Sequence, residues 1–185
     1  MYNIKRKTIN TKYKMIYWIF DMDETLYQIT GRFNYESLKI DTELINLLKK
    51  LNGLKILFTN GTHQHTNIVL SKMGLASSFD LILDRNILGV MKPSPIAFMK
   101  LIKWCSITPN DTCYYFEDSV YNLIVGTSLG WQTILINSSN TNTNKNNIVE
   151  FDFIKNGQKI KKRVVINYTF KNIKDSLKHF INRMP

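Results

Sequence analysis

The chain has 185 residues, of which 44% are hydrophobic and 12% aromatic, and its formal net charge is +11. This length and composition predict one folded domain with a substantial hydrophobic core and exclude a disordered chain. No apolar stretch approaches the roughly 20 residues of a membrane-spanning helix, and the basic start lacks the apolar run of a secretory signal, so we expect a soluble protein with no membrane partner.

The positive charge is concentrated at the two ends of the chain. Residues 1–14 carry five Lys/Arg and no acid, and residues 138–185 carry ten Lys/Arg against three acids. Residues 15–137 hold ten basic and eleven acidic side chains. Two interpretations stay open: the ends attract a polyanion such as nucleic acid, or they are solvated segments whose composition reflects an AT-rich genome, such as that of a giant virus.

Predicted strands and helices alternate along the chain. After a basic N-terminal arm, 1–14, apolar runs predict strands at 15–20, 54–58, 79–83, 112–116 and 132–136. Residues 26–40 are expected to form a loop or a small hairpin. Helices are predicted from 41 to Gly53, at 65–73, at 96–104, from 119 to 129, and at 172–182. This alternation is typical of a three-layer α/β fold with a doubly wound parallel sheet.

The remaining C-terminal residues are expected to extend this fold. The Asn/Thr/Ser-rich segment 137–147 predicts a flexible loop. Residues 148–154 alternate between apolar and polar, Asn156-Gly157 is a strong turn sequence, and residues 159–166 return with β-branched side chains. Residues 148–166 therefore predict a β-hairpin appended to the sheet edge. We therefore expect one domain over 15–185.

Polar residues follow four of the predicted strands at the point where each strand ends. Because the carboxyl ends of parallel strands share one edge of a sheet, we expect these side chains to converge. An alternative for the first group is a turn or helix cap, since Asp and Thr are preferred there. Carboxylates, a hydroxyl and an ammonium group together suit a phosphoryl group with Mg²⁺. The residues concerned are Asp21, Asp23 and Thr25, then Thr59 and Asn60, then Lys92, then Glu117 and Asp118.

The cysteines and histidines suggest no separate metal site. Cys105 and Cys113 have neither zinc-site nor C-x-x-C spacing, so we expect free thiols in a reducing intracellular compartment. His63 and His65 form an H-x-H pair, but no third ligand lies nearby in the sequence.

The strings DMDET, TNG, KP and EDS appear in this order between residues 15 and 137. Because it carries these strings in this order and at this spacing, the chain resembles the haloacid dehalogenase (HAD) superfamily. The longer strings FTNGTHQH, KPSP and FEDSVYN are most similar to the branch with pyrimidine 5′-nucleotidases and β-phosphoglucomutase-like enzymes. The resemblance implies a HAD-like Rossmannoid fold and a Mg²⁺-dependent phosphatase.

The resemblance also implies roles for the acidic residues. Asp21 would be the nucleophile that forms an aspartyl-phosphate and would also bind the metal. Asp23 would be the general acid and then the general base, while its backbone carbonyl binds Mg²⁺. Asp118 would complete the metal site, with Glu117 helping directly or through water. Haloacid dehalogenases lack a second acid at the position of Asp23, so its presence favours phosphate-ester hydrolysis.

Other residues of the resembling motifs would bind the phosphate group. Thr59 and Lys92 would contact its oxygens, and Lys92 would also offset the charge of Asp21. The backbone amides of Met22, Asn60 and Gly61 would donate hydrogen bonds to it.

One departure from the resembling branch concerns the substrate. Only 33 residues separate Thr25 from Thr59, which leaves no room for a helical cap domain, so the site should be open. An open site favours a phosphorylated macromolecule, such as a protein or a nucleic-acid end, over the nucleotide that the resembling branch implies, or else a second copy of the chain supplies a lid. Tyr27, Phe33 and Tyr35 would either stack on a base or pack in the core. A catalytically silent binding module with this fold is the remaining alternative.

Overall fold

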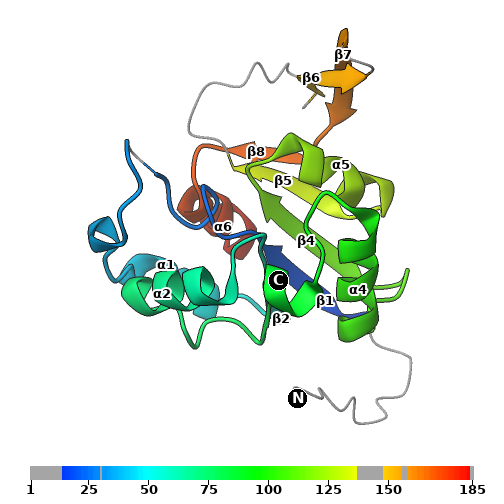
Figure 1. Ribbon diagram of the computed structural model, residues 1–185. Coiled ribbons are helices and arrows are strands. Elements are labelled where there is room, and N and C mark those ends of the chain that lie inside the picture. The colour runs from blue at the N-terminus through cyan, green and yellow to red at the C-terminus, as the bar shows by residue number, and fades with distance from the viewer. Residues whose placement is uncertain (1–13, 30, 137–147, 156–157, 184–185) are drawn as a thin grey trace.

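The computed structural model describes residues 14–29, 31–136, 148–155 and 158–183, which form a parallel sheet flanked by helices (Figure 1). Six parallel strands have the order β3-β2-β1-β4-β5-β8. Their bounds are β1 Ile16–Phe20, β2 Leu54–Phe58, β3 Leu81–Leu83, β4 Thr112–Glu117, β5 Gln132–Ile136 and β8 Tyr168–Phe170. The helices are η1 Tyr35–Ser37, α1 Thr42–Lys49, α2 His63–Met73, α3 Arg85–Leu88, α4 Pro95–Cys105, α5 Val120–Ser128 and α6 Ile173–Ile181. The prediction of a doubly wound parallel α/β sheet is confirmed.

Two hydrophobic cores lie on opposite faces of the sheet because side chains alternate along each strand. From β1, Trp18 and Phe20 pack with α1, α2 and α6 in the first core, and Tyr17 and Ile19 pack with α4 and α5 in the second. Figure 1 shows these two groups of helices on either side of the strands. The central strand is therefore buried on both faces, as expected for a continuous apolar run.

Local sequence explains where the helices next to the site begin and end. Asp41 caps α1 by accepting from the amide of Leu44 at 3.0 Å, as its position before the apolar stripe predicts. Thr62 caps α2 through the amide of His65, so this helix begins two residues earlier than predicted. Gly74 ends α2 with a φ of +71°, a conformation that glycine adopts without strain.

Three C-terminal and connecting elements differ from the predictions. The predicted hairpin is present as β6, Ile148–Lys155, and β7, Gln158–Val165, but it forms a separate two-stranded sheet and does not join the edge of the six-stranded sheet. The edge position belongs instead to β8, whose three residues are too few for a clear alternating pattern. The four-residue α3 was missed for the same reason. The predicted arm and the loop 137–147 lie outside the described residues, apart from Lys14.

The connection between β1 and β2 leaves the sheet edge open. Its described part holds only η1 and α1 besides loop, so no cap domain is inserted there, as predicted. Among the described residues, no helix combines the length and the apolarity that crossing a membrane requires. Both cysteines are free, Cys105 at the end of α4 and Cys113 in β4.

Candidate active site

Strand register brings polar residues from distant parts of the chain to one edge. Phe20, the last residue of β1, pairs with Leu57 of β2 and Phe116 of β4, so the three strands end at nearly the same level. Asp21 and Glu117 therefore lie side by side although they are 96 positions apart in the sequence. The backbone amide of Asp21 also donates to the Phe116 carbonyl at 2.9 Å, which holds the first residue after β1 against β4.

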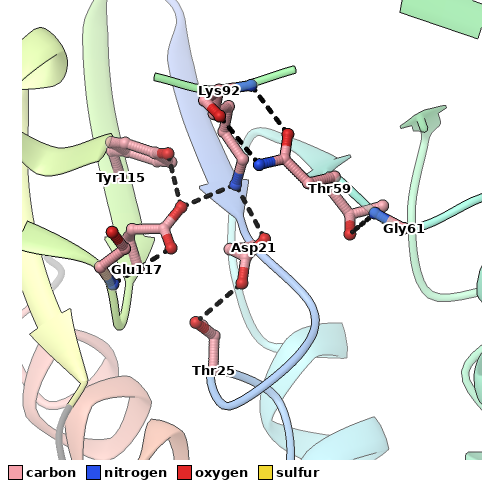
Figure 2. Close-up of polar contacts among 9 residues, drawn as sticks. Asp21, Thr25, Thr59, Gly61, Lys92, Tyr115 and Glu117 are labelled. Carbon is pink, nitrogen blue, oxygen red and sulfur yellow. Dashed lines mark hydrogen bonds and ion pairs between the residues drawn. The ribbon is translucent and has the colours of Figure 1, made fainter. Parts of the chain in front are cut away.

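Lys92 joins the two carboxylates (Figure 2). Its ammonium nitrogen lies 2.8 Å from Oδ1 of Asp21 and 2.7 Å from Oε2 of Glu117, and its side chain is only 1% exposed. The nitrogen also lies over the rings of Phe58 and Tyr115, at 5.0 and 5.8 Å from their centres. Together Asp21, Lys92, Tyr115 and Glu117 form a group that we call the buried centre.

Glu117 is held on both of its carboxylate oxygens. Oε2 accepts from Lys92 and, at 2.7 Å, from the hydroxyl of Tyr115, while Oε1 accepts from the amide of Ser119 at 3.2 Å. Although burial raises the pKa of Glu117, the Lys92 ammonium holds it below its ordinary value. Glu117 thus mainly holds Lys92 in place. It would contact a bound metal through a water molecule, or through an oxygen that it shares with Lys92.

Asp21, Glu117 and Asp118 also form a group with the spacing of a metal site. One carboxylate oxygen from each lies within 4.8 Å of the others. Burial, and then the charge of Glu117, raise the pKa of Asp21 to about 7 and that of Asp118 to about 8. Closely spaced carboxylates repel one another when all are ionised, and a hard divalent cation bound between them stabilises the ionised form. This set of oxygen donors therefore fits Mg²⁺.

The loop after β2 lies beside this group. The Asn60 side chain accepts from the backbone amide of Lys92 at 2.8 Å and donates to its carbonyl at 3.0 Å. The buried Thr59 hydroxyl accepts from the amide of Gly61 at 2.9 Å. Sequence reasoning assigned the Asn60 amide to phosphate and missed the role of its side chain, which fixes the loop that carries Lys92.

The chain turns back immediately after β1. Glu24 adopts a positive φ of 59°, and the Thr25 hydroxyl then donates to Oδ2 of Asp21 at 3.2 Å. The backbone amide of Met22 donates to the same carboxylate, which opposes the rise in its pKa. The expected placement of Asp21 and Asp23 on one side of an extended chain stays a prediction, because this turn begins only after Asp23.

Asp23 belongs to a second group of hydrogen-bonded side chains, which are more exposed than the buried centre. Its Oδ1 accepts from Nε2 of His65 at 2.8 Å and from the hydroxyl of Tyr27. Nδ1 of His65 lies 2.8 Å from the hydroxyl of Tyr35. We call Asp23, Tyr27, Tyr35 and His65 the rim. The sequence analysis noted His65 only as half of an H-x-H pair. Its position in the first turn of α2, close behind the loop after β2, could have predicted that it lies near the site.

The aromatic residues that followed the first motif pack against one another. The Phe33 ring lies 4.9 Å from Tyr35, 6.1 Å from Tyr27 and 5.7 Å from His65, measured between ring centres. These contacts support the packing interpretation of these side chains over base stacking.

The described part of the basic C-terminal region carries mixed charge. In the hairpin, Lys159 pairs with Asp152 and Arg163 pairs with Glu150, each at 2.7 Å. These pairs reduce the positive charge offered to a polyanion, and binding of nucleic acid stays a prediction. A homo-oligomer that supplies a lid also stays a prediction.

A comparison with protein-family models identifies the family of this chain. The family model described as haloacid dehalogenase-like hydrolase matches residues 32–130, more than half of the chain. The match includes Thr59, Lys92, Glu117 and Asp118 and begins after Asp21. The narrower similarity to nucleotidases and phosphoglucomutases is not tested by this match.

Solved structures share the fold at low sequence identity. An L-2-haloacid dehalogenase from Xanthobacter autotrophicus with covalently bound chloropropionic acid has a TM-score of 0.57 at 12% identity, covering 82% of this chain and 64% of that one. A HAD phosphatase from Thermococcus onnurineus has a TM-score of 0.51 at 19% identity, covering 76% and 57%. A dehalogenase with an intermediate complex gives 0.55 at 15%, covering 78% and 58%. The chain thus spans about three fifths of the length of these proteins.

Proposed function

The chain belongs to the haloacid dehalogenase-like hydrolase family, and from this premise we propose that it is a Mg²⁺-dependent phosphatase that hydrolyses a phosphate monoester through an aspartyl-phosphate. The observation that carries the proposal is the contact between Asp21 and Lys92 beside Asp118, with a further acid, Asp23, two residues along the chain. A dehalogenating enzyme needs no proton donor for a departing alcohol, so Asp23 supports the phosphatase.

The arrangement supports a division of labour between the two aspartates. Asp21 attacks phosphorus, and the bond between phosphorus and the leaving oxygen breaks as Asp23 transfers a proton to that oxygen. Asp23, now ionised, takes a proton from water as the water oxygen attacks phosphorus and the bond to Asp21 breaks. Phosphate leaves, and both aspartates return to their starting state.

The other residues of the site hold charge in place. Lys92 lies on the attacking carboxylate, where its ammonium group offsets negative charge as the phosphoryl group approaches. Asp21, Asp118 and the backbone carbonyl of Asp23 would hold Mg²⁺, with Glu117 acting through water. The cation would supply further neutralisation of the phosphate oxygens. Thr59 and the amides of Met22, Asn60 and Gly61 are the proposed phosphate donors.

The convergence of these groups favours an enzyme over a silent binding module. A module that had lost catalysis would not need an ammonium group and two carboxylates buried together, because such a cluster is costly to desolvate. The substrate stays a proposal: a phosphorylated nucleotide, protein or nucleic-acid end that reaches an open site.

The test is hydrolysis of p-nitrophenyl phosphate by the full chain with Mg²⁺, with Asp21→Asn as the matched variant. We expect turnover that needs Mg²⁺ and falls at least about 10³-fold in Asp21→Asn, because an amide cannot act as the nucleophile. Chloride release from 2-chloropropionate is measured in parallel. Halide release without phosphate release, or undiminished turnover by Asp21→Asn, would contradict the proposal.

A further inference from the structure

Asp23 is fixed by two donors that converge on one of its oxygens. Nε2 of His65 and the hydroxyl of Tyr27 both bind Oδ1, so Oδ2 is the oxygen left for a substrate or a water molecule. The Asp23 side chain is 35% exposed, far more than those of Asp21 and Lys92 in the buried centre. An exposed carboxylate samples several rotamers unless neighbouring groups hold it, so these two donors decide where Oδ2 points.

His65 is itself held from three sides. Its backbone amide donates to the Thr62 hydroxyl at 3.2 Å in the first turn of α2, and its ring packs edge-on against Phe33. A Cβ on Gly61 would lie only 3.0 Å from Cδ2 of His65, so the imidazole packs directly against the backbone of the loop after β2. The imidazole is thus a spacer between that loop and Asp23.

The two hydrogen bonds of the His65 ring are satisfied together if Tyr35 donates to the ring and the ring donates to Asp23. A tyrosine hydroxyl can donate to Nδ1, which leaves the proton of a neutral imidazole on Nε2, where it donates to the Asp23 carboxylate. Tyr35 occupies this place, 2.8 Å from Nδ1. With this tautomer, each hydrogen bond in the chain Tyr35, His65, Asp23 has one donor and one acceptor.

We propose that His65 is a positioning residue that aims Oδ2 of Asp23 at the departing oxygen of the substrate. This inference rests on the proposed phosphatase activity and adds a residue to it. In the first step, the proton on Oδ2 passes to the leaving oxygen as its bond to phosphorus breaks and the bond from Asp21 forms. His65 exchanges no proton in this step; its role is to keep the donor within reach.

This role predicts an effect that depends on the leaving group. A departing oxygen that is strongly basic needs its proton in the transition state, whereas a weakly basic one leaves without it. Phenyl phosphate and 2,4-dinitrophenyl phosphate offer these two cases with rings of similar size. The ratio kcat/KM is the right measurement because it covers the steps up to loss of the leaving group and omits later attack by water.

The experiment compares His65→Ala, His65→Gln and His63→Ala with the unaltered protein on both esters. His63 is the matched control: it lies on the same turn and pairs with the buried Asp84 at 2.7 Å rather than with Asp23. We expect His65→Ala to lower kcat/KM about 10²-fold for phenyl phosphate and less than about threefold for the dinitrophenyl ester. His65→Gln keeps a donor and should recover much of the loss, and His63→Ala should leave the ratio of the two esters unchanged.

The outcomes separate the inference from the function on which it rests. If the unaltered protein hydrolyses neither ester, the phosphatase proposal itself is overturned. If it hydrolyses both and His65→Ala lowers the two kcat/KM values equally, or neither of them, the phosphatase stands and the positioning role is overturned. Should His65→Ala not fold, as judged by thermal unfolding, His65→Gln decides: a fall in kcat/KM that is larger for phenyl phosphate than for the dinitrophenyl ester supports the positioning role, and an equal fall on both esters, or no fall, contradicts it.

Discussion

The buried centre and the rim are built alike but differ in their access to water. Each has a carboxylate held by a nitrogen donor and by a tyrosine hydroxyl: Glu117 by Lys92 and Tyr115, Asp23 by His65 and Tyr27. The side chains of Lys92 and Glu117 are each 1% exposed, whereas those of His65 and Asp23 are 20% and 35% exposed. Hydrogen bonds from similar kinds of donor should therefore contribute very differently to stability in the two groups.

The contrast shows how one sheet edge can hold both a buried electrostatic centre and a proton donor that solvent and substrate can reach. In the buried centre, water cannot replace a lost partner, so a single ammonium group must balance two carboxylates. Burial lowers the pKa of Lys92, but Asp21 and Glu117 outweigh this and raise it above its ordinary value, so the residue stays charged. At the rim, solvent screens the charges and can take the place of a missing donor.

The largest effect is expected from removing the cation of the buried centre. Lys92→Met keeps the apolar stem and leaves two buried carboxylates without their partner, so we expect a loss of about 3–5 kcal/mol in the free energy of unfolding. Chemical denaturation of the metal-free protein measures it. Lys72→Met is the control, because Lys72 pairs at 2.8 Å with the exposed Glu36 and should change stability little. Similar losses in both variants would contradict the contrast between centre and surface.

Removing a hydroxyl from the buried centre should have the next largest effect. Tyr115→Phe deletes the 2.7 Å hydrogen bond to Oε2 of Glu117 without changing the packing of the ring. Hydrogen bonds to charged groups contribute about 1.5–3 kcal/mol, and we expect a loss of this size in the free energy of unfolding. Thermal and chemical denaturation measure it. A loss below about 0.5 kcal/mol would mean that water reaches Glu117 after all.

Asp118 offers a change of the opposite sign. Its pKa is raised from 3.8 to about 8, so the folded metal-free protein binds this proton more tightly than the unfolded chain. Stability should therefore fall as the pH rises between those two values. Asp118→Asn removes the charge and should make the metal-free protein about 1–2 kcal/mol more stable at pH 8, with allowance for partial exposure.

Mg²⁺ provides the control for this prediction. The cation should stabilise the unaltered protein at pH 8, because it binds ionised carboxylates of the folded state, and should have much less effect on Asp118→Asn. Unfolding is measured at pH 5 and pH 8 with and without Mg²⁺. A variant that is less stable than the unaltered protein at pH 8 without metal would contradict the repulsion between Asp118 and its neighbours.

The sequence predicted the buried centre better than the rim, for a physical reason. Asp21 directly follows β1 and Glu117 ends β4, and parallel strands align those ends whatever the loops do. Lys92 lies nine residues beyond β3, after α3, and was predicted from its motif. The rim depends on a turn with a positive φ at Glu24 and on which face of the first turn of α2 meets Asp23, and neither has a clear sequence pattern. The elements β8 and α3 were missed because they are too short to display a hydrophobic period. The sequence also did not predict that the hairpin forms a separate sheet, since pairing at a sheet edge depends on tertiary packing.

The smallest effect on stability is expected at the rim, where a second tyrosine completes the comparison. Tyr35→Phe removes the partner of Nδ1 of His65, as Tyr115→Phe removes a partner of Glu117. Tyr35 is only partly buried, so water can replace the lost hydroxyl, and the free energy of unfolding should fall by no more than about 1 kcal/mol. Without the Tyr35 hydroxyl, the rotation of the His65 imidazole is less restricted. The kcat/KM for phenyl phosphate should therefore fall a fewfold in Tyr35→Phe, which is a smaller loss than the one expected in His65→Ala. If Tyr35→Phe destabilised the protein as much as Tyr115→Phe, the rim would be as dry as the centre, and Asp23 would be a fixed part of the core rather than an accessible proton donor.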